Sequence, residues 1–161
     1  WEAVSYAWGD TKNTSVVHLP DGSVLPIKSN LDSFLRHRRE KDRIVTLWID
    51  ALCINQEGVH EKNHQVQNMS MVYGGASRLT IWLGPAHSDS KLAVDELKCL
   101  GAGTPYQKIS LTERKVVAAI ADLLSRPWWS RFWIIQEVRY GILGKKSRTP
   151  KSCVEMIILP G

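Results

Sequence analysis

Apolar runs alternate with amphipathic stretches along this chain, and the alternation predicts an α/β fold. Residues 3–8, 44–49 and 79–83 are rich in β-branched and bulky side chains with few polar positions, so we expect buried strands there. Residues 29–43 and 59–73 place apolar side chains at spacings of three and four, which is typical of helices that bury one face. This order predicts parallel strands joined by helical crossovers.

Three further segments add to this pattern. Residues 16–19 and 24–27 flank Asp21-Gly22, which predicts a hairpin, and Pro20 and Pro26 would keep it off the centre of a sheet. We expect a short helix over residues 89–100 and another after a capping box at Ser110 and Glu113, with a buried side formed by Val116, Val117, Ile120, Leu123 and Leu124. Pro127 suits the first turn of the next element, in which apolar residues 128–138 would surround a helix on nearly every side.

The ends of the first two predicted strands carry polar side chains. Asp50, Asn55 and Gln56 follow the strand at 44–49, and ligands of open α/β sheets bind at such carboxyl ends. The alternative is that Asp50 caps a turn and the two amides bind loop backbone. The spacing leaves both interpretations open. Near the first strand end, the candidates for the same site are Ser5, Tyr6, Trp8 and Asp10.

Glu137 is the other candidate, because it lies within an apolar segment that contains three tryptophans. Isolated burial would raise the pKa of its carboxyl group, so the side chain must be either paired or used. Pairing with Arg126, Arg131 or a backbone amine would make it a structural group, and a catalytic role is the other interpretation.

Composition narrows the class of protein. The 161 residues suffice for one domain, and the net charge of +5 is concentrated at residues 36–43 and 145–151. No nucleic-acid-binding motif accompanies these clusters, so we expect a solvated basic face and no nucleic-acid partner. An odd number of cysteines, three, and the lack of a signal peptide or membrane-length apolar run favour a cytoplasmic setting with no membrane association. Because the chain begins at Trp1 without Met, we expect a trimmed fragment.

Two short motifs invite enzyme interpretations that we do not favour. Residues 60–64 match the zinc-protease pattern H-E-x-x-H, but their setting is polar and no third ligand follows, so we expect no metal. Cys53 lies near His60 and His64 in sequence, as a thiol nucleophile would, yet a cysteine at a strand end is more often a small buried hydrophobe.

Three blocks of the sequence carry a resemblance to a known family. They are AVSYAWGD at residues 3–10, LWIDALCINQ at residues 47–56 and RPWWSRFWIIQE at residues 126–137. In this order and at these separations they resemble the signature blocks of the fungal heterokaryon incompatibility (HET) domain. The resemblance covers residues 1–140, which we expect to form the domain, followed by a basic tail of uncertain structure at residues 141–161.

The resemblance implies a flavodoxin-like, three-layer α/β sandwich, because HET domains have been proposed as distant relatives of TIR domains. It also implies a cytoplasmic effector of fungal non-self recognition and cell death, joined to sensor domains or proteins and able to form homo-oligomers. TIR domains that cleave NAD carry a catalytic glutamate in a comparable segment, so an NAD nucleosidase activity is expected, with NAD as substrate and no further cofactor. The residues implied are catalytic Glu137 and, for substrate binding, Ser5, Trp8, Gly9, Asp10, Asp50, Asn55, Gln56, Trp133 and Gln136.

A non-enzymatic module is the alternative implied by the same resemblance. In that case the tryptophan-rich segments would be core, and the surfaces of the domain would self-associate to signal death. Release of nicotinamide from NAD distinguishes the two hypotheses.

Overall fold

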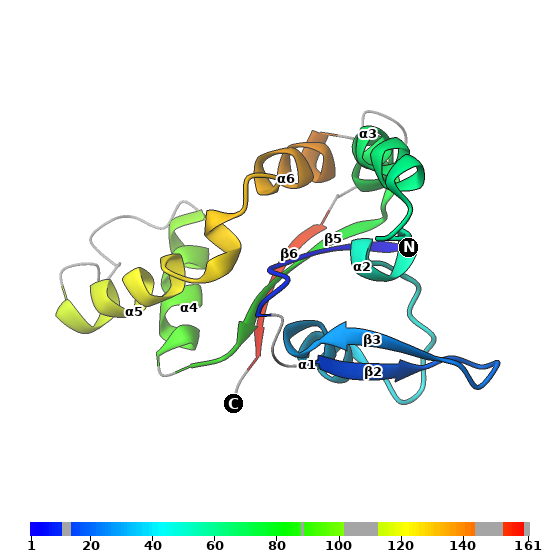
Figure 1. Ribbon diagram of the computed structural model, residues 1–161. Coiled ribbons are helices and arrows are strands. Elements are labelled where there is room, and N and C mark those ends of the chain that lie inside the picture. Colours follow the sequence, from blue (N-terminus) through cyan, green and yellow to red (C-terminus); the bar gives the residue numbers. More distant parts are fainter. Residues whose placement is uncertain (11–13, 88, 102–112, 144–152, 160–161) are drawn as a thin grey trace.

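A parallel sheet of four strands forms the centre of the molecule (Figure 1). The computed structural model describes residues 1–10, 14–87, 89–101, 113–143 and 153–159. The strands lie in the order β4 (Leu47–Trp48), β1 (Glu2–Tyr6), β5 (Arg78–Pro85) and β6 (Cys153–Leu159), each parallel to its neighbours. Numbered within this sheet alone, the order is 2-1-3-4, which is the beginning of the flavodoxin-like order. The predicted α/β fold with a mainly parallel sheet is confirmed.

The predicted hairpin is also confirmed as an addition outside this sheet. Strands β2 (Thr14–His18) and β3 (Val24–Lys28) pair only with each other, in antiparallel register from Thr14 opposite Lys28 to His18 opposite Val24. Gly22 takes a φ of 84° in the connecting turn, as the Asp-Gly pair predicts. The hairpin lies beside α1 (Ser29–Arg38), as Figure 1 shows.

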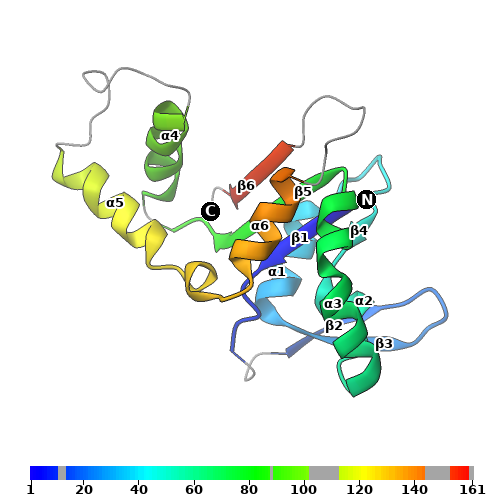
Figure 2. The same ribbon diagram turned by 90° about the horizontal axis from the view of Figure 1, so that it is seen from above.

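Helices cover the sheet on both faces. On one face α1 packs through Leu31 and Phe34 against Val4, Tyr6 and Trp82. The other face carries α3 (Val59–Gly75) and α6 (Ile134–Leu143), which lie side by side in Figures 1 and 2. Side chains of β1 therefore belong to two cores, because strand side chains alternate between faces: Ala3 faces α3 and α6, while Val4 and Tyr6 face α1.

The remaining helices extend this framework at its ends. Helix α2 (Asp50–Cys53) begins directly after β4, and α4 (Ser90–Gly101) follows β5. With α5 (Arg114–Leu124), α4 forms a helical pair beyond the end of the sheet (Figures 1 and 2). A single 3₁₀ turn, η2 (Pro127–Ser130), then leads back toward α6, with proline in its first turn as predicted.

Several predicted boundaries are wrong. The strand expected over residues 44–49 is reduced to the two residues of β4 at the sheet edge, where Ile44 is 95% exposed. An edge strand has a single neighbour to pair with, so its flanking residues leave the sheet. The helix expected to reach residue 43 ends at Arg38, since the residues beyond it offer no apolar side chain to bury.

Two predicted helix faces are confirmed only in part. In α5, Val116 and Leu123 are buried and Ile120 packs against the core as predicted, whereas Val117 and Leu124 are exposed and Ala119 is buried instead. The apolar segment 128–138 is not one helix, because Arg131 has an extended backbone between η2 and α6. Phe132 and Ile135 in this segment are 79% and 71% exposed. The proposed capping residue Ser110 lies outside the described residues.

The C-terminal segment contributes more than a tail. Helix α6 continues past residue 140 to Leu143, and residues 153–159 form β6 along β5. Gly141 lies so close to β5 that an added Cβ would approach Leu79 Cδ2 within 2.7 Å. Residues beyond 140 therefore take part in the sandwich.

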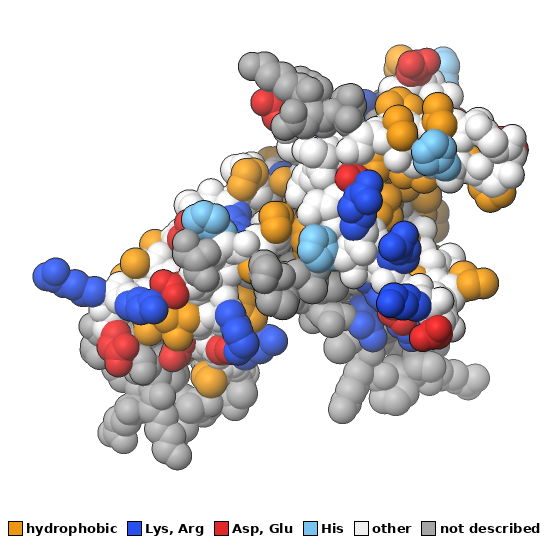
Figure 3. All heavy atoms as spheres, turned by 90° about the horizontal axis from the view of Figure 1, so that it is seen from below, with side chains coloured by type: hydrophobic (Ala, Val, Ile, Leu, Met, Phe, Trp, Pro, Cys, Tyr) orange, Lys and Arg blue, Asp and Glu red, His pale blue; other side chains and the backbone are white. Residues whose placement is uncertain are grey.

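Several charged side chains of the first basic cluster form ion pairs. Within the first basic cluster, Arg36 pairs with Asp32, Arg38 with Glu2 and Glu40, and Arg43 with Glu40. Figure 3 accordingly shows acidic side chains among the basic ones on the face that it presents. None of the described helices is both long and apolar enough to span a membrane.

Candidate functional site

Glu137 forms the centre of a buried polar network in which three segments meet. It lies in the first turn of α6 and is 0% exposed. Arg131 holds its carboxylate by two hydrogen bonds, from Nη2 to Oε1 at 2.8 Å and from Nη1 to Oε2 at 3.1 Å. This bidentate ion pair compensates for the loss of water around both charges. Of the two interpretations of Glu137, the structure therefore shows the paired one, with Arg131 as the partner.

Ser5 of β1 connects this ion pair to the core. Its hydroxyl donates a hydrogen bond to Glu137 Oε2 and accepts hydrogen bonds from Trp128 Nε1 at 2.8 Å and Arg131 Nη1 at 3.2 Å. Both Ser5 and Trp128 are buried. A polar serine in the middle of an apolar strand is thus explained by its three partners, since buried hydroxyl groups require hydrogen bonds.

Asp50 is the second carboxylate of the site, and its partners are neutral. Its Oδ2 accepts a hydrogen bond from Trp8 Nε1 at 2.9 Å, and its Oδ1 accepts one from the backbone N–H of Ala51 at 2.7 Å. Burial, and after it the charge of Asp50, raises the pKa of the Tyr6 hydroxyl well above its ordinary value. Burial raises the pKa of the Asp50 carboxyl above its ordinary value, although the Trp8 and Ala51 hydrogen bonds and the charge of Arg131 act against this rise.

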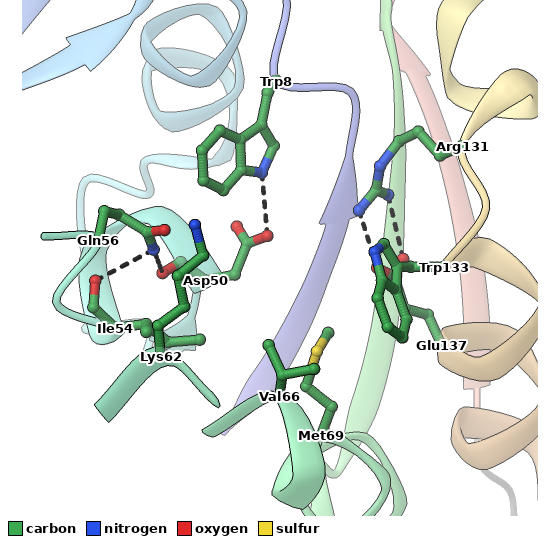
Figure 4. A pocket seen from close by; sticks show the side chains of 10 residues that line it. All are labelled: Trp8, Asp50, Ile54, Gln56, Lys62, Val66, Met69, Arg131, Trp133 and Glu137. Atoms are coloured by element: carbon green, nitrogen blue, oxygen red, sulfur yellow. Dashed lines mark hydrogen bonds and ion pairs between the residues drawn. The ribbon is translucent and has the colours of Figure 1, made fainter. Parts of the chain in front are cut away.

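A pocket of about 330 Å³ brings the two carboxylates together (Figure 4). Asp50 and Trp8 lie on one side of it, and Arg131, Trp133 and Glu137 lie on the other. Its volume is at the lower end of the range for small-molecule sites, which are typically apolar with a few placed polar groups. The remaining lining residues are Ile54, Gln56, Lys62, Val66 and Met69.

Comparison with known proteins identifies the family of the chain. The model of the heterokaryon incompatibility protein (HET) family matches residues 1–137. The chain belongs to the HET family. It is 39% identical over 111 residues to a Neurospora crassa protein named heterokaryon incompatibility protein 6, OR allele. The match covers 62% of this chain and 16% of that protein, so the chain spans a small part of its relative's length. No solved structure matches the chain significantly.

The HET fold brings five of the predicted site residues to the pocket: Trp8, Asp50, Gln56, Trp133 and Glu137. Gln56 lies in the wall because its Nε2 donates hydrogen bonds to the backbone oxygens of Asp50 at 2.9 Å and Ile54 at 3.1 Å. Ser5 lies behind the pocket as a partner of Glu137. Residues of the second and third HET signature blocks thus line opposite sides of one cavity, and Trp8 of the first block lies on the side of Asp50.

Four other predicted site residues do not line this pocket of the HET domain. Gly9 has a φ of 74° and shapes the turn after Trp8, and Asp10 follows it on the surface. Asn55 Oδ1 accepts hydrogen bonds from the backbone N–H groups of Glu57 and Gly58, which matches the alternative of a loop-stabilising amide. Gln136 is exposed on α6.

Sequence reasoning missed three α3 side chains that line the HET pocket, namely Lys62, Val66 and Met69. Their spacing of four and three was recognised, but it was assigned to the core. These three side chains line the pocket, and Tyr73, further along the same face, is its buried residue. Periodicity indicates that a helix face is covered, and it does not distinguish a core from a pocket.

The H-E-x-x-H motif of the HET domain lies on the exposed N-terminal part of α3. Glu61 Oε1 accepts a hydrogen bond from the backbone N–H of Asn55 at 3.2 Å, and the ring of His64 contacts Asn68. Within the described part of the chain, no three His, Cys, Asp or Glu side chains gather in a way that would hold a metal ion. Cys53, predicted to be buried, is an exposed free thiol.

Proposed function

We propose that this HET domain acts in heterokaryon incompatibility as a cell-death effector, and that its pocket hydrolyses the nicotinamide N-glycosidic bond of NAD. The incompatibility role is supported by the family and by the name of the Neurospora crassa relative. The NAD chemistry is supported by one observation above all. The buried carboxylate of Glu137 lines a pocket of about 330 Å³ together with a second carboxylate, that of Asp50. The indole rings of Trp8 and Trp133 lie on two sides of this pocket.

The reaction requires few groups. The bond between ribose C1′ and the pyridinium nitrogen breaks, and its electron pair neutralises the nicotinamide, so the leaving group needs no proton. Positive charge then develops on the ribose as an oxocarbenium ion, which a fixed carboxylate stabilises. Water adds its oxygen to C1′ and releases one proton, which gives nicotinamide, ADP-ribose and H⁺.

The lining residues fit distinct parts of this reaction. Glu137 faces the developing charge, and Arg131 fixes the orientation of its carboxylate. Trp8 and Trp133 offer ring faces for stacking with nicotinamide. Asp50 and Gln56 provide oxygens and an amide for the ribose hydroxyls or the carboxamide.

A substrate that enters the pocket meets the side chains that cover Glu137. Among the described residues, its Oε2 accepts two hydrogen bonds and its Oε1 accepts one, which leaves an acceptor position on Oε1. The carboxylate is nevertheless 0% exposed, and in Figure 4 Trp133 lies in front of it. We therefore expect Trp133, which is exposed at its outer side, to move when substrate enters.

The test is nicotinamide release from NAD by the purified protein at high concentration. Glu137→Gln should lower turnover at least 10²-fold, the order of a lost electrostatic contribution to the transition state. Glu96→Gln, on α4 and away from the pocket, is the matched control and should leave turnover unchanged. Equal turnover of Glu137→Gln and the wild type would disprove the proposal.

Folding of the Glu137→Gln variant is checked by its thermal unfolding, because Arg131 loses its charged partner. Trp133→Ala provides a second route, since this exposed side chain contributes little to the core. It should raise KM for NAD and leave the melting temperature within a few degrees of the wild type. An unchanged KM would contradict the stacking role of Trp133.

A non-enzymatic interaction module is the second candidate, and an exposed apolar patch favours it. Phe132, Trp133 and Ile135, with Trp129 beside them, lie on the surface around the start of α6. Exposed apolar patches mark interaction surfaces in soluble proteins. A wild-type protein that releases no nicotinamide but self-associates in sedimentation, with self-association lost in a Phe132→Ser, Ile135→Ser double variant, would support this candidate.

A further inference from the structure

A second pocket lies next to the first, on the other side of Trp8. Its volume is also about 330 Å³, and it is lined by residues of β1, β3, α1 and α2. Trp8 and Gln56 line both pockets. The two cavities are therefore neighbours that share a wall, and an elongated ligand would reach from one to the other across these two side chains.

We propose that the second pocket binds the adenine nucleotide half of a dinucleotide whose other end occupies the first. This inference rests on the proposed function, because it names what holds the part of the substrate that does not react. The tight binding of a distant part of a substrate contributes to catalysis at the reacting end, so a site for it is functionally useful.

The lining of the second pocket suits a planar base. Trp8 contributes the accessible aromatic surface, and the buried side chains of Tyr6, Ile27 and Leu31 lie beneath the slot. Nucleobases stack on aromatic side chains whatever their identity, because each base has a π face. Tyr6 and Ile27 are held in place by the core, which makes this slot a rigid part of the fold.

Basic side chains suit the diphosphate that joins the two halves. Lys28 lines the second pocket with its ammonium group 5.1 Å from the centroid of the Trp8 ring, and Lys62 lines the first. A linker that crosses the shared wall at Trp8 and Gln56 thus has a cation in each pocket. The two carboxylates, Asp50 and Glu137, belong to the first pocket only, so the anionic linker and the pyridinium end are matched to opposite charges.

The two pockets share the wall formed by Trp8 and Gln56, so a ligand that crosses this wall occupies both pockets at once. We expect the two halves of the ligand to bind more tightly when joined than their separate affinities imply.

Calorimetric titration of the whole chain with ADP and, separately, with nicotinamide mononucleotide tests this assignment. Ala51 lines only the second pocket and is partly buried at the start of α2, so Ala51→Trp should fill the slot. We expect this variant to weaken ADP binding at least tenfold and to leave nicotinamide mononucleotide binding within about twofold, where tenfold corresponds to 1.4 kcal/mol.

Lys28→Gln is a second variant that does not depend on repacking. It should weaken ADP about fivefold and reduce the salt dependence of binding, since one charge contact with phosphate is lost. Lys41→Gln, on the exposed loop after α1, is the matched control and should bind ADP as the wild type does. Circular dichroism confirms that each variant is folded.

The outcomes separate the two proposals. ADP that fails to bind the wild type, or that binds Ala51→Trp and Lys28→Gln unchanged, overturns the second site, even if nicotinamide is released from NAD. ADP binding that both variants weaken supports the site, even if no nicotinamide is released; the cleavage proposal would then fail alone.

Discussion

The two carboxylates of the pocket illustrate two ways to place an acid inside a protein. Glu137 is completely buried and is held by a guanidinium group in a bidentate pair, with a serine hydroxyl as its third donor. Asp50 is only partly buried and is held by an indole and a backbone N–H, both of them neutral. Complete burial of Glu137 depends on a cation, whereas burial raises the pKa of Asp50 despite its two neutral donors.

Because of this difference, the carboxyl groups of Glu137 and Asp50 suit different chemical roles. A carboxylate held by arginine at both oxygens is fixed in position, which suits the stabilisation of a developing cation. A carboxyl with a raised pKa binds its proton more tightly than an ordinary aspartate does, which suits contact with hydroxyl groups of a ligand. The comparison predicts that variants that disturb the Glu137 ion pair lower stability strongly, and that the effect of a variant at Asp50 depends on pH.

Arg131→Met should have the largest effect on stability. It leaves Glu137 buried without its cation, and the loss of one partner of a buried ion pair typically costs about 3–5 kcal/mol. Denaturant unfolding measures this free energy. Arg36→Met is the matched control, because Arg36 is 73% exposed beside Asp32 and should change little. Equal effects of the two variants would mean that the Glu137 pair is not the buried anchor described above.

Ser5→Ala should have an intermediate effect. The variant removes the hydroxyl that joins Glu137, Trp128 and Arg131, so a buried indole N–H loses its acceptor at a cost of about 1–3 kcal/mol. Ser130→Ala is the control, since its exposed hydroxyl donates only to the backbone oxygen of Pro127. A Ser5→Ala protein as stable as the Ser130→Ala protein would show that the network adds nothing to folding.

Asp50→Asn should have the smallest effect, and one that depends on pH. Because the folded-state pKa of Asp50 is raised, the native state binds its proton more tightly than the unfolded state does. The contribution of Asp50 to stability therefore falls as pH rises above about 4, the ordinary range for aspartate. Asn lacks this titration, so the variant should gain stability relative to wild type as pH rises above about 4 in denaturant unfolding. Parallel pH curves would contradict the raised pKa.

Much of the fold follows from local pattern. The run at residues 79–83 is apolar on both sides and becomes the central part of β5, with both faces covered. The Asp21-Gly22 turn specifies the hairpin. By contrast, residues 44–49 have an equally apolar pattern, yet most of them lie outside the sheet, because position in the strand order decides which apolar runs are covered.

The features of the functional site likewise follow partly from the sequence and partly from the tertiary structure. The amino-acid sequence by itself determined that acids and tryptophans gather in the blocks at residues 3–10, 47–56 and 126–137, and it indicated that a glutamate among three tryptophans needs a partner or a task. Only the tertiary structure decided that Arg131 is that partner, and that Asp50 shares its pocket with Glu137. The physical reason is distance along the chain: Ser5 and Glu137 are 132 residues apart and Ser5 and Trp128 are 123 apart, so they meet only after the parallel strands have paired and the helices have packed upon them.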